Sequence, residues 1–174
     1  MAAVFAACWL AVAAHAADTP AAPASPGGEI GAVKRLPEFN LERLGGGRAR
    51  SADLLGRVSV LNFFFETCVP CIKEAPMLSA FRRRHPEYHY LAVTVDSSVE
   101  AGRFVGQRKL DWPVAIDAGP LIGAMQVKGF PTYLLVAADG RILGRGTGMD
   151  TSTMQHPDLA LAQFEQWVKQ RLTR

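Results

Sequence analysis

The sequence has few cysteines, and their small number excludes several kinds of site. Its 174 residues include three cysteines, Cys8, Cys68 and Cys71, and four histidines. A closed structural zinc site needs four ligands, and the sequence has no second cysteine pair to complete one. Disulfide scaffolds use several bridges that close long loops, whereas a Cys68–Cys71 bridge would close a very short one. The cysteine pair therefore offers too few ligands for a structural zinc site, and a disulfide between its members would stabilise the fold only weakly.

Charge is also scarce. Charged residues make up 20% of the chain, and the formal net charge is +3. The densest basic run, Arg82–Arg84, is expected at the end of a helix, where cations complement the negative end of the helix dipole. A solvated helix face is therefore favoured over a nucleic-acid patch, and no nucleic-acid partner is predicted. The apolar share of 49% is typical of one globular domain.

Residues 1–16 contain no Asp, Glu, Lys or Arg. Their apolar stretch ends in the small-x-small pattern of residues 14–16, which is typical of a signal peptide cleaved before Ala17. The basic residues that usually precede such a stretch are missing, and an uncleaved membrane anchor is the alternative. Residues 17–35, rich in Ala and Pro, predict a flexible tether. Cleavage would remove Cys8 and place the protein in the periplasm or another extracytoplasmic space.

Residues 36–174 predict one α/β domain. Val58–Phe65 is a nearly continuous apolar run, as expected for a strand buried on both faces. Helix and strand patterns then alternate, and an Asp139-Gly140 turn joins the last two strands. The predicted order β-α-β-α-β-α-β-β-α favours a mixed central sheet with helices on both faces. Apolar residues at helical spacing in the last helix are expected in the core: Leu161, Phe164, Trp167, Val168 and Leu172.

The cysteine pair lies where the strand pattern stops and a helix pattern begins. Cys68 is expected to cap that helix or start its first turn, where unpaired N–H groups and the helix dipole favour thiolate over thiol. Because the thiolate is the nucleophile, Cys68 is the candidate for attack on a substrate. Cys71, one turn further in, would resolve the mixed disulfide. Binding of Cu(I) by the two thiolates is the alternative use; no metal or other cofactor is otherwise predicted.

Three motifs occur in two segments: CxPC and CxxCxxE in VLNFFFETCVPCIKEAP at 60–76, and GxPT in VKGFPTYLLVAADGRILGRGTG at 127–148. Together they resemble the thioredoxin-fold family of exported thiol-disulfide oxidoreductases, in particular its TlpA/ResA branch. The resemblance spans about residues 36–172. It implies a thioredoxin-like fold with a short N-terminal extension, in which Cys68 and Cys71 are the redox pair.

The resemblance also implies roles for residues around the pair. Pro131 matches the family's cis-proline, which would expose the backbone of Phe130 to an extended substrate segment. Glu74 matches the acid of CxxCxxE, expected to be partly buried, where it would raise cysteine pKa values or take the proton of Cys71. Asn62 stands where many thioredoxins have a buried acid, which leaves Glu74 as the candidate for acid–base help.

The sequence departs from the family directly before the first cysteine. Glu66 and Thr67 stand in a run that usually ends in Trp. If the Glu66 side chain faces the active site, its negative charge makes the thiolate less favourable, so Glu66 is a candidate for redox tuning.

The resemblance implies an exported reductase of disulfides in client proteins, such as apocytochrome c or copper-site proteins, that is recharged by a membrane electron donor of the DsbD/CcdA type. The residues Val69 and Pro70 offer no charge to stabilise a thiolate, and Glu66 and Glu74 would oppose it, which favours the reducing direction. An oxidase or isomerase of the same fold is the alternative within this class. A copper-handling or client-binding module is the alternative outside it.

Overall fold

The computed structural model describes residues 33–149 and 152–173. The predicted signal peptide and residues 17–32 of the predicted tether lie outside this part of the chain. In the described residues, no helix has both the length and the apolar character that a bilayer span requires. The elements in chain order are β1 (Asn40–Glu42), β2 (Arg48–Arg50), the 3-10 helix η1 (Ser51–Leu54), β3 (Ser59–Phe64), α1 (Val69–Arg84), β4 (His89–Thr94), α2 (Ser98–Arg108), β5 (Val114–Ala115), α3 (Gly119–Ala124), β6 (Thr132–Val136), β7 (Ile142–Thr147), the 3-10 helix η2 (Thr153–Gln155) and α4 (Pro157–Leu172).

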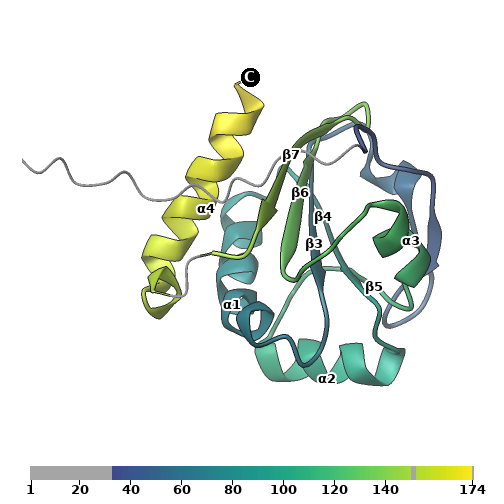
Figure 1. The fold of residues 1–174 in the computed structure, drawn as a ribbon, viewed down its shortest axis with the longest axis horizontal. Helices are drawn as coiled ribbons and strands as arrows, with labels where there is room; N and C mark the ends of the chain where they lie inside the picture. The colour runs from purple at the N-terminus through teal and green to yellow at the C-terminus, as the bar shows by residue number, and fades with distance from the viewer. Residues whose placement is uncertain (1–32, 150–151, 174) are drawn as a thin grey trace, which may run out of the picture.

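The central sheet has the strand order β5-β4-β3-β6-β7 (Figure 1). Strands β3, β4 and β5 run parallel, whereas β6 is antiparallel to both β3 and β7. The predicted mixed sheet is confirmed. All six residues of the central strand β3 are buried, as expected from its continuous apolar run.

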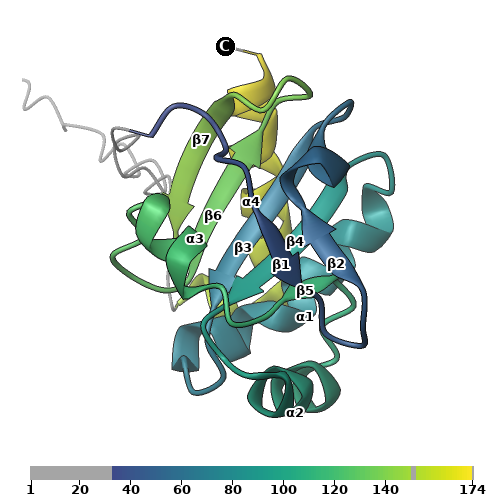
Figure 2. The same ribbon diagram turned by 90° about the vertical axis from the view of Figure 1, so that its right-hand side faces the viewer.

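Helices cover both faces of this sheet, as predicted (Figures 1 and 2). Because side chains alternate along a strand, β3 contributes Val60 and Phe64 to one apolar cluster and Leu61 and Phe63 to another. Helices α1 and α4 pack in the first cluster and α3 in the second. Both cysteines belong to the first cluster.

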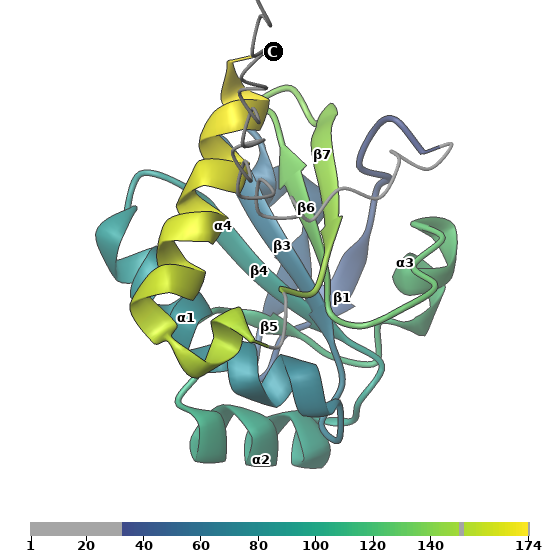
Figure 3. The same ribbon diagram turned by 60° about the vertical axis from the view of Figure 1, so that its left-hand side comes forward.

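Helix α4 packs beside α1 through an aromatic contact (Figure 3). The ring centroid of Phe164 lies 4.8 Å from that of Phe81 on α1 and 5.0 Å from that of Tyr133 on β6. Four of the five predicted core residues of α4 are buried, but Leu172 is 39% exposed. That prediction is wrong because Leu172 is the last residue of α4, two turns beyond the contact with Phe81.

A small hairpin precedes the central sheet and lies along its edge. Strands β1 and β2 pair antiparallel, and Gly45–Gly47 make the turn with positive φ angles that only glycine adopts readily. The Leu44 N–H donates to the Val114 carbonyl over 2.9 Å, which ties the hairpin to β5. At the other edge, the Ile142 N–H donates to the carbonyl of Lys34 over 2.9 Å. Backbone hydrogen bonding to the central sheet therefore already includes Lys34, two residues before the predicted domain start at residue 36.

Candidate active site

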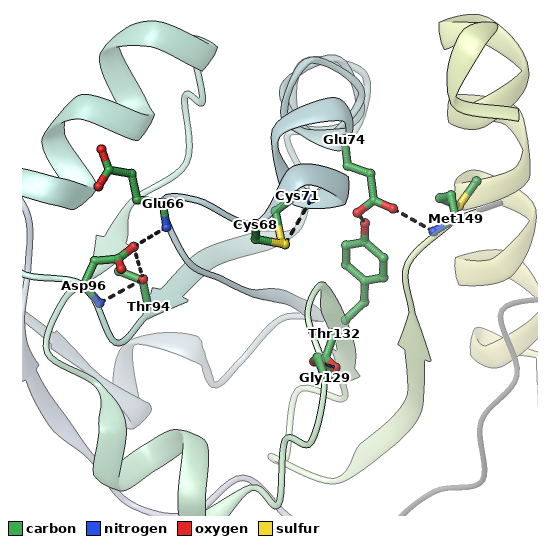
Figure 4. The surroundings of a disulfide bond; sticks show 10 residues. Glu66, Cys68, Cys71, Glu74, Thr94, Asp96, Gly129, Thr132 and Met149 are labelled. Atoms are coloured by element: carbon green, nitrogen blue, oxygen red, sulfur yellow. Dashed lines mark hydrogen bonds between the residues drawn. A yellow bond between two sulfur atoms is a disulfide. The ribbon is translucent and has the colours of Figure 1, made fainter. Parts of the chain in front are cut away.

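Cys68 and Cys71 form a disulfide where the chain passes from β3 into α1 (Figure 4). Cys68 is the N-cap residue of α1, as expected, and the Cys71 N–H donates to its Sγ over 3.3 Å. An N–H directed at the sulfur and the positive end of the helix dipole both favour a thiolate on Cys68 after reduction. The two residues are only 4% and 2% exposed. Burial therefore does not distinguish the attacking cysteine, whereas the helix cap favours Cys68.

The residues next to the cysteines in the sequence are mostly apolar. Val69, directly after Cys68, is 61% exposed, and Pro70 occupies the first turn of α1, where its missing N–H needs no partner. The ring of Phe65 lies edge-on to the ring of Phe130, with centroids 5.2 Å apart. The segment before the pair and the loop before β6 therefore touch through two aromatic rings.

The Phe130–Pro131 bond is cis, as the resemblance implied. The Gly148 N–H donates to the Pro131 carbonyl over 3.1 Å, so the chain after β7 passes directly over this loop. A Cβ at Gly148 would lie 3.1 Å from the Pro131 ring and 3.3 Å from Oε1 of Glu74. Because Gly148 has no side chain, the segment after β7 can lie close to both Pro131 and Glu74. Recognition of a substrate segment by Phe130 and Pro131 stays a prediction.

Glu74 is fully buried, with 0% of its surface exposed, rather than partly buried as expected. The Met149 N–H donates to its Oε1 over 2.7 Å, and the Tyr133 hydroxyl hydrogen-bonds to its Oε2 (Figure 4). Burial raises the pKa of Glu74 to about 8, although the hydrogen bond from Met149 acts in the opposite direction. No ion pair with Glu74 occurs within the described chain. The carboxyl group therefore keeps its proton at neutral pH.

The hydrogen-bond partners of Glu74 lie on β6 and just after β7, not at the cysteines. A proton exchange with Cys71 would require a water molecule or a movement that opens one of these bonds. Asn62 lies opposite Tyr133 in the β3–β6 pairing and is 2% exposed. Its Oδ1 atom accepts no hydrogen bond from the described residues.

The Glu66 carboxylate points away from the disulfide (Figure 4). Nε and Nη2 of Arg103 on α2 donate to its two oxygens over 2.6 and 2.9 Å. The hydrogen bond with Arg103 lowers the pKa of Glu66. Its predicted redox role depended on a carboxylate that faces the active site, and the structure does not meet this condition. Pairing with a guanidinium also offsets the negative charge.

The backbone of Glu66 makes a second contact. Its N–H donates to Oδ2 of Asp96 over 2.6 Å, and the Thr94 hydroxyl donates to the same oxygen over 2.7 Å (Figure 4). Desolvation raises the pKa of Asp96, while the hydrogen bonds from Thr94 and Glu66 oppose this shift. The segment before Cys68 is thus tied to the end of β4, and Thr67 lies within it.

Four further residues hold the site together and were not predicted from the sequence: Arg103, Asp96, Tyr133 and Met149. Tyr133 had a weak signal, because it follows Pro131 closely in the GFPTY segment. The other three had none, because their contacts are distant in the chain: Met149 is 75 positions from Glu74, and Arg103 and Asp96 are 37 and 30 positions from Glu66.

The described residues contain no group of three or more His, Cys, Asp or Glu side chains placed to hold a metal ion. A two-thiolate Cu(I) site needs only the cysteine pair, so this observation leaves that alternative open.

Several proteins with similar sequences are named thiol-disulfide oxidoreductases. The family model named Redoxin matches residues 32–162. The thiol-disulfide oxidoreductase ResA of a Bacillus cereus strain is 32% identical over 122 residues, which cover 68% of this chain and 70% of that protein.

Solved structures match the fold over most of the chain. A thiol:disulfide interchange protein of the thioredoxin family from Chlorobium tepidum TLS has a TM-score of 0.66 at 22% identity, over 80% of this chain and 96% of that one. The thioredoxin domain of a thiol-disulfide oxidoreductase from Bacteroides vulgatus has a TM-score of 0.64 at 20% identity, over 77% and 95%. These two structures confirm the predicted thioredoxin-like fold.

Proposed function

The chain belongs to the Redoxin family and is a ResA-like thiol-disulfide oxidoreductase, and from this premise we propose that it reduces disulfides in client proteins outside the cytoplasm. The observation that carries the proposal is the Cys68–Cys71 pair at the start of α1, with the Cys71 N–H directed at Cys68 Sγ. This arrangement supports an attacking and a resolving cysteine.

The reaction begins with the dithiol form. The Cys68 thiolate attacks one sulfur of a client disulfide, the client S–S bond breaks, and one client thiolate leaves. Cys71 then loses its proton and attacks Cys68 Sγ, which forms the Cys68–Cys71 disulfide and releases the second client thiolate. Both client thiolates take up protons. The client gains two electrons and the cysteine pair loses two.

Glu74 is our candidate for the group that accepts the proton which Cys71 loses. Its pKa of about 8 lies much closer to the usual range of a cysteine thiol than that of an ordinary carboxyl group does, so the Glu74 carboxylate is a stronger base toward a thiol. The ionised minority of Glu74 at neutral pH is the form that accepts the proton.

The reducing direction is supported by the absence of charge at Val69 and Pro70 between the cysteines. A strong oxidant needs a stabilised thiolate, as in DsbA. Neither carboxyl group expected to disfavour the thiolate does so by its charge at neutral pH, because Glu74 is protonated and Glu66 is paired with Arg103.

Export and client identity belong to the same proposal. The signal-peptide pattern of residues 1–16 supports export to the periplasm or another extracytoplasmic space. The resemblance to the TlpA/ResA branch supports clients in cytochrome c maturation or copper-site assembly, and recharging by a membrane electron donor of the DsbD/CcdA type. The loop of Phe130 and Pro131 would offer backbone groups to an extended client segment.

The test is the reduction potential of the Cys68–Cys71 pair, together with turnover in a disulfide reduction assay. We expect a potential near that of thioredoxin, about −270 mV, and loss of turnover in Cys68→Ser. Cys71→Ser should accumulate a mixed disulfide with the client, visible by mass spectrometry. A potential near about −120 mV, the value of DsbA, would reverse the direction of electron flow. Stoichiometric Cu(I) retention without turnover would favour a copper-handling module.

A further inference from the structure

A cavity of about 370 Å³ lies at the end of the sheet remote from the disulfide. Its walls come from the hairpin, η1, the C-terminal end of α1 and the first residues of β4. In the parallel pairing of β3 and β4, Ser59 lies opposite His89 and Phe64 opposite Thr94. The chain enters the active-site segment just after Phe64, so His89 marks the other end of these strands. The five residue steps from His89 to Thr94 correspond to about 17 Å along β4, which separates the cavity from the active-site end of the sheet.

The charge of the cavity lining is strongly one-sided. Asp53 is the only carboxylate among the lining residues, and four arginines share the wall: Arg43, Arg48, Arg50 and Arg82. None of these four has an ion-pair partner in residues 33–149 and 152–173. Carboxylates do pair with four arginines elsewhere in that part of the chain: Arg83, Arg84, Arg103 and Arg141.

The basic run at the end of α1 shows this division within three consecutive residues. Arg83 pairs with Asp111 over 3.9 Å, and Arg84 pairs with Glu165 over 3.2 Å. Arg82 lines the cavity instead. All three arginines lie in the last turn of α1, as expected, and Arg82 in addition lines the cavity.

Neutral groups hold two of the cavity arginines in place. Nε of Arg48 donates to Oδ1 of Asn40 over 2.7 Å, and Nε of Arg43 donates to the carbonyl of Gly46 over 3.2 Å. These contacts orient the guanidinium groups without neutralising them. An arginine oriented in this way loses less conformational freedom when it binds an anion.

His89 also lines the cavity, and one of its ring nitrogens lies buried behind that lining. Nε of Arg57 lies 3.0 Å from Nε2 of His89. Because a guanidinium can only donate, Nε2 accepts, and the ring proton of the neutral imidazole lies on Nδ1. Nδ1 is buried and has no hydrogen-bond partner within the described residues. Because Nδ1 is buried, the four arginines, rather than this donor, supply the groups that face a ligand in the cavity.

We propose that this cavity binds a phosphate group, carried by a small organic phosphate or by a phospholipid headgroup. Four guanidinium groups against one carboxylate leave three positive charges, which a phosphate dianion offsets better than a single carboxylate does. Guanidinium groups also bind phosphate oxygens in pairs. The volume falls in the range of small-molecule pockets, about 300–1,000 Å³. Apolar and aromatic parts of the wall, from Leu54, Tyr88 and Pro113, suit an organic group next to the phosphate.

The experiment titrates the full chain with inorganic pyrophosphate at constant ionic strength and follows backbone amide signals by NMR. We expect saturable shifts at Tyr88 and His89. Arg82→Gln should weaken binding at least tenfold, as expected for the loss of a charge-assisted hydrogen bond. Arg83→Gln is the matched control, because it makes the same charge change one residue away and should leave the affinity within twofold. Arg48→Gln is the second test variant, and disulfide reduction by all three variants checks that they fold.

Vesicles distinguish the two sources of the phosphate. Cosedimentation with phosphatidylglycerol vesicles, compared with phosphatidylcholine vesicles, tests the headgroup. If Arg82→Gln but not Arg83→Gln reduces vesicle binding, and pyrophosphate does not bind, the site is assigned to a phospholipid headgroup. Pyrophosphate binding with the same pattern of variants assigns it to a soluble phosphate. The proposal is overturned if neither probe binds saturably, or if Arg82→Gln and Arg83→Gln weaken binding equally.

Discussion

Glu66 and Glu74 flank the cysteine pair on its two sides, and their carboxyl groups meet opposite environments. Glu74 on α1 is buried and forms no ion pair within the described residues, and its pKa rises to about 8. Glu66 lies against Arg103, and its pKa is lowered. Both residues stand within three positions of a cysteine. The comparison shows that tertiary neighbours, rather than distance along the chain, decide the charge of a carboxyl group near a redox pair.

The two flanks also stabilise different things. The Glu74 flank joins α1 to Tyr133 on β6 and to Met149 after β7, and Gly148 brings Pro131 into the same cluster. The Glu66 flank ties the backbone before Cys68 to Asp96 at the end of β4. The Glu74 flank thus keeps a protonated carboxyl group on α1, whereas the Glu66 flank fixes the backbone that leads into Cys68.

The largest effect should come from the charge state of Glu74. Below about pH 4.5 the folded and unfolded states both bind its proton; between there and about pH 8 only the folded state does. Stability of the oxidised protein should therefore fall as pH rises through this window, by on the order of 5 kcal/mol for the full shift. Glu74→Gln should remove this slope. Urea unfolding at pH 5 and pH 8 measures it, and an equal slope in both proteins would show that Glu74 ionises normally.

Tyr133→Phe tests the same flank with a smaller change. It removes the hydroxyl that hydrogen-bonds to Oε2 of Glu74 and leaves the ring in place. We expect a loss of about 1–3 kcal/mol in the free energy of unfolding at neutral pH. Tyr88→Phe is the matched control, because the Tyr88 hydroxyl has no hydrogen-bond partner within the described chain. Equal losses in both variants would contradict a specific role for the Tyr133 hydroxyl.

On the other flank, Asp96→Ala removes the acceptor of the Glu66 N–H. Because one hydrogen bond to a charged group is lost, we expect exchange of the Glu66 amide hydrogen to become about tenfold faster. Hydrogen–deuterium exchange followed by NMR measures it. Asp111→Ala, which breaks only the ion pair with Arg83, should leave this amide unchanged. Unaltered exchange in Asp96→Ala would mean that another contact holds the segment.

The smallest effect is expected from the exposed ion pair. Arg103→Gln leaves the charge of Glu66 uncompensated, so the pKa of Cys68 should rise slightly and the reduction potential should become more negative by less than about 30 mV. Glu66→Gln leaves Arg103 unpaired and should shift both quantities the other way. The double variant should return close to the wild type. Thiolate absorbance and redox equilibration measure the shifts, and shifts of the same sign in both single variants would refute this account.

Much of the fold could be predicted from local patterns. The continuous apolar run of β3 required cover on both faces, and the order of helix and strand patterns led to the mixed sheet that the structure contains. Leu172 was misplaced because helical spacing does not reveal where the neighbouring helix stops. The cap position of Cys68 was predictable because it depends only on where a strand pattern changes into a helix pattern.

The environment of each carboxyl group was not predictable in this way. Glu66 and Arg103 are 37 positions apart, and Glu74 and Met149 are 75 apart. Local sequence limits backbone conformation because φ and ψ preferences act between near neighbours. A pKa instead depends on burial and on nearby charges, which are contributed by segments distant in the chain. The CxxC motif at a strand–helix junction was thus readable from the sequence, whereas the protonated acid on one side and the ion-paired acid on the other were decided by tertiary packing.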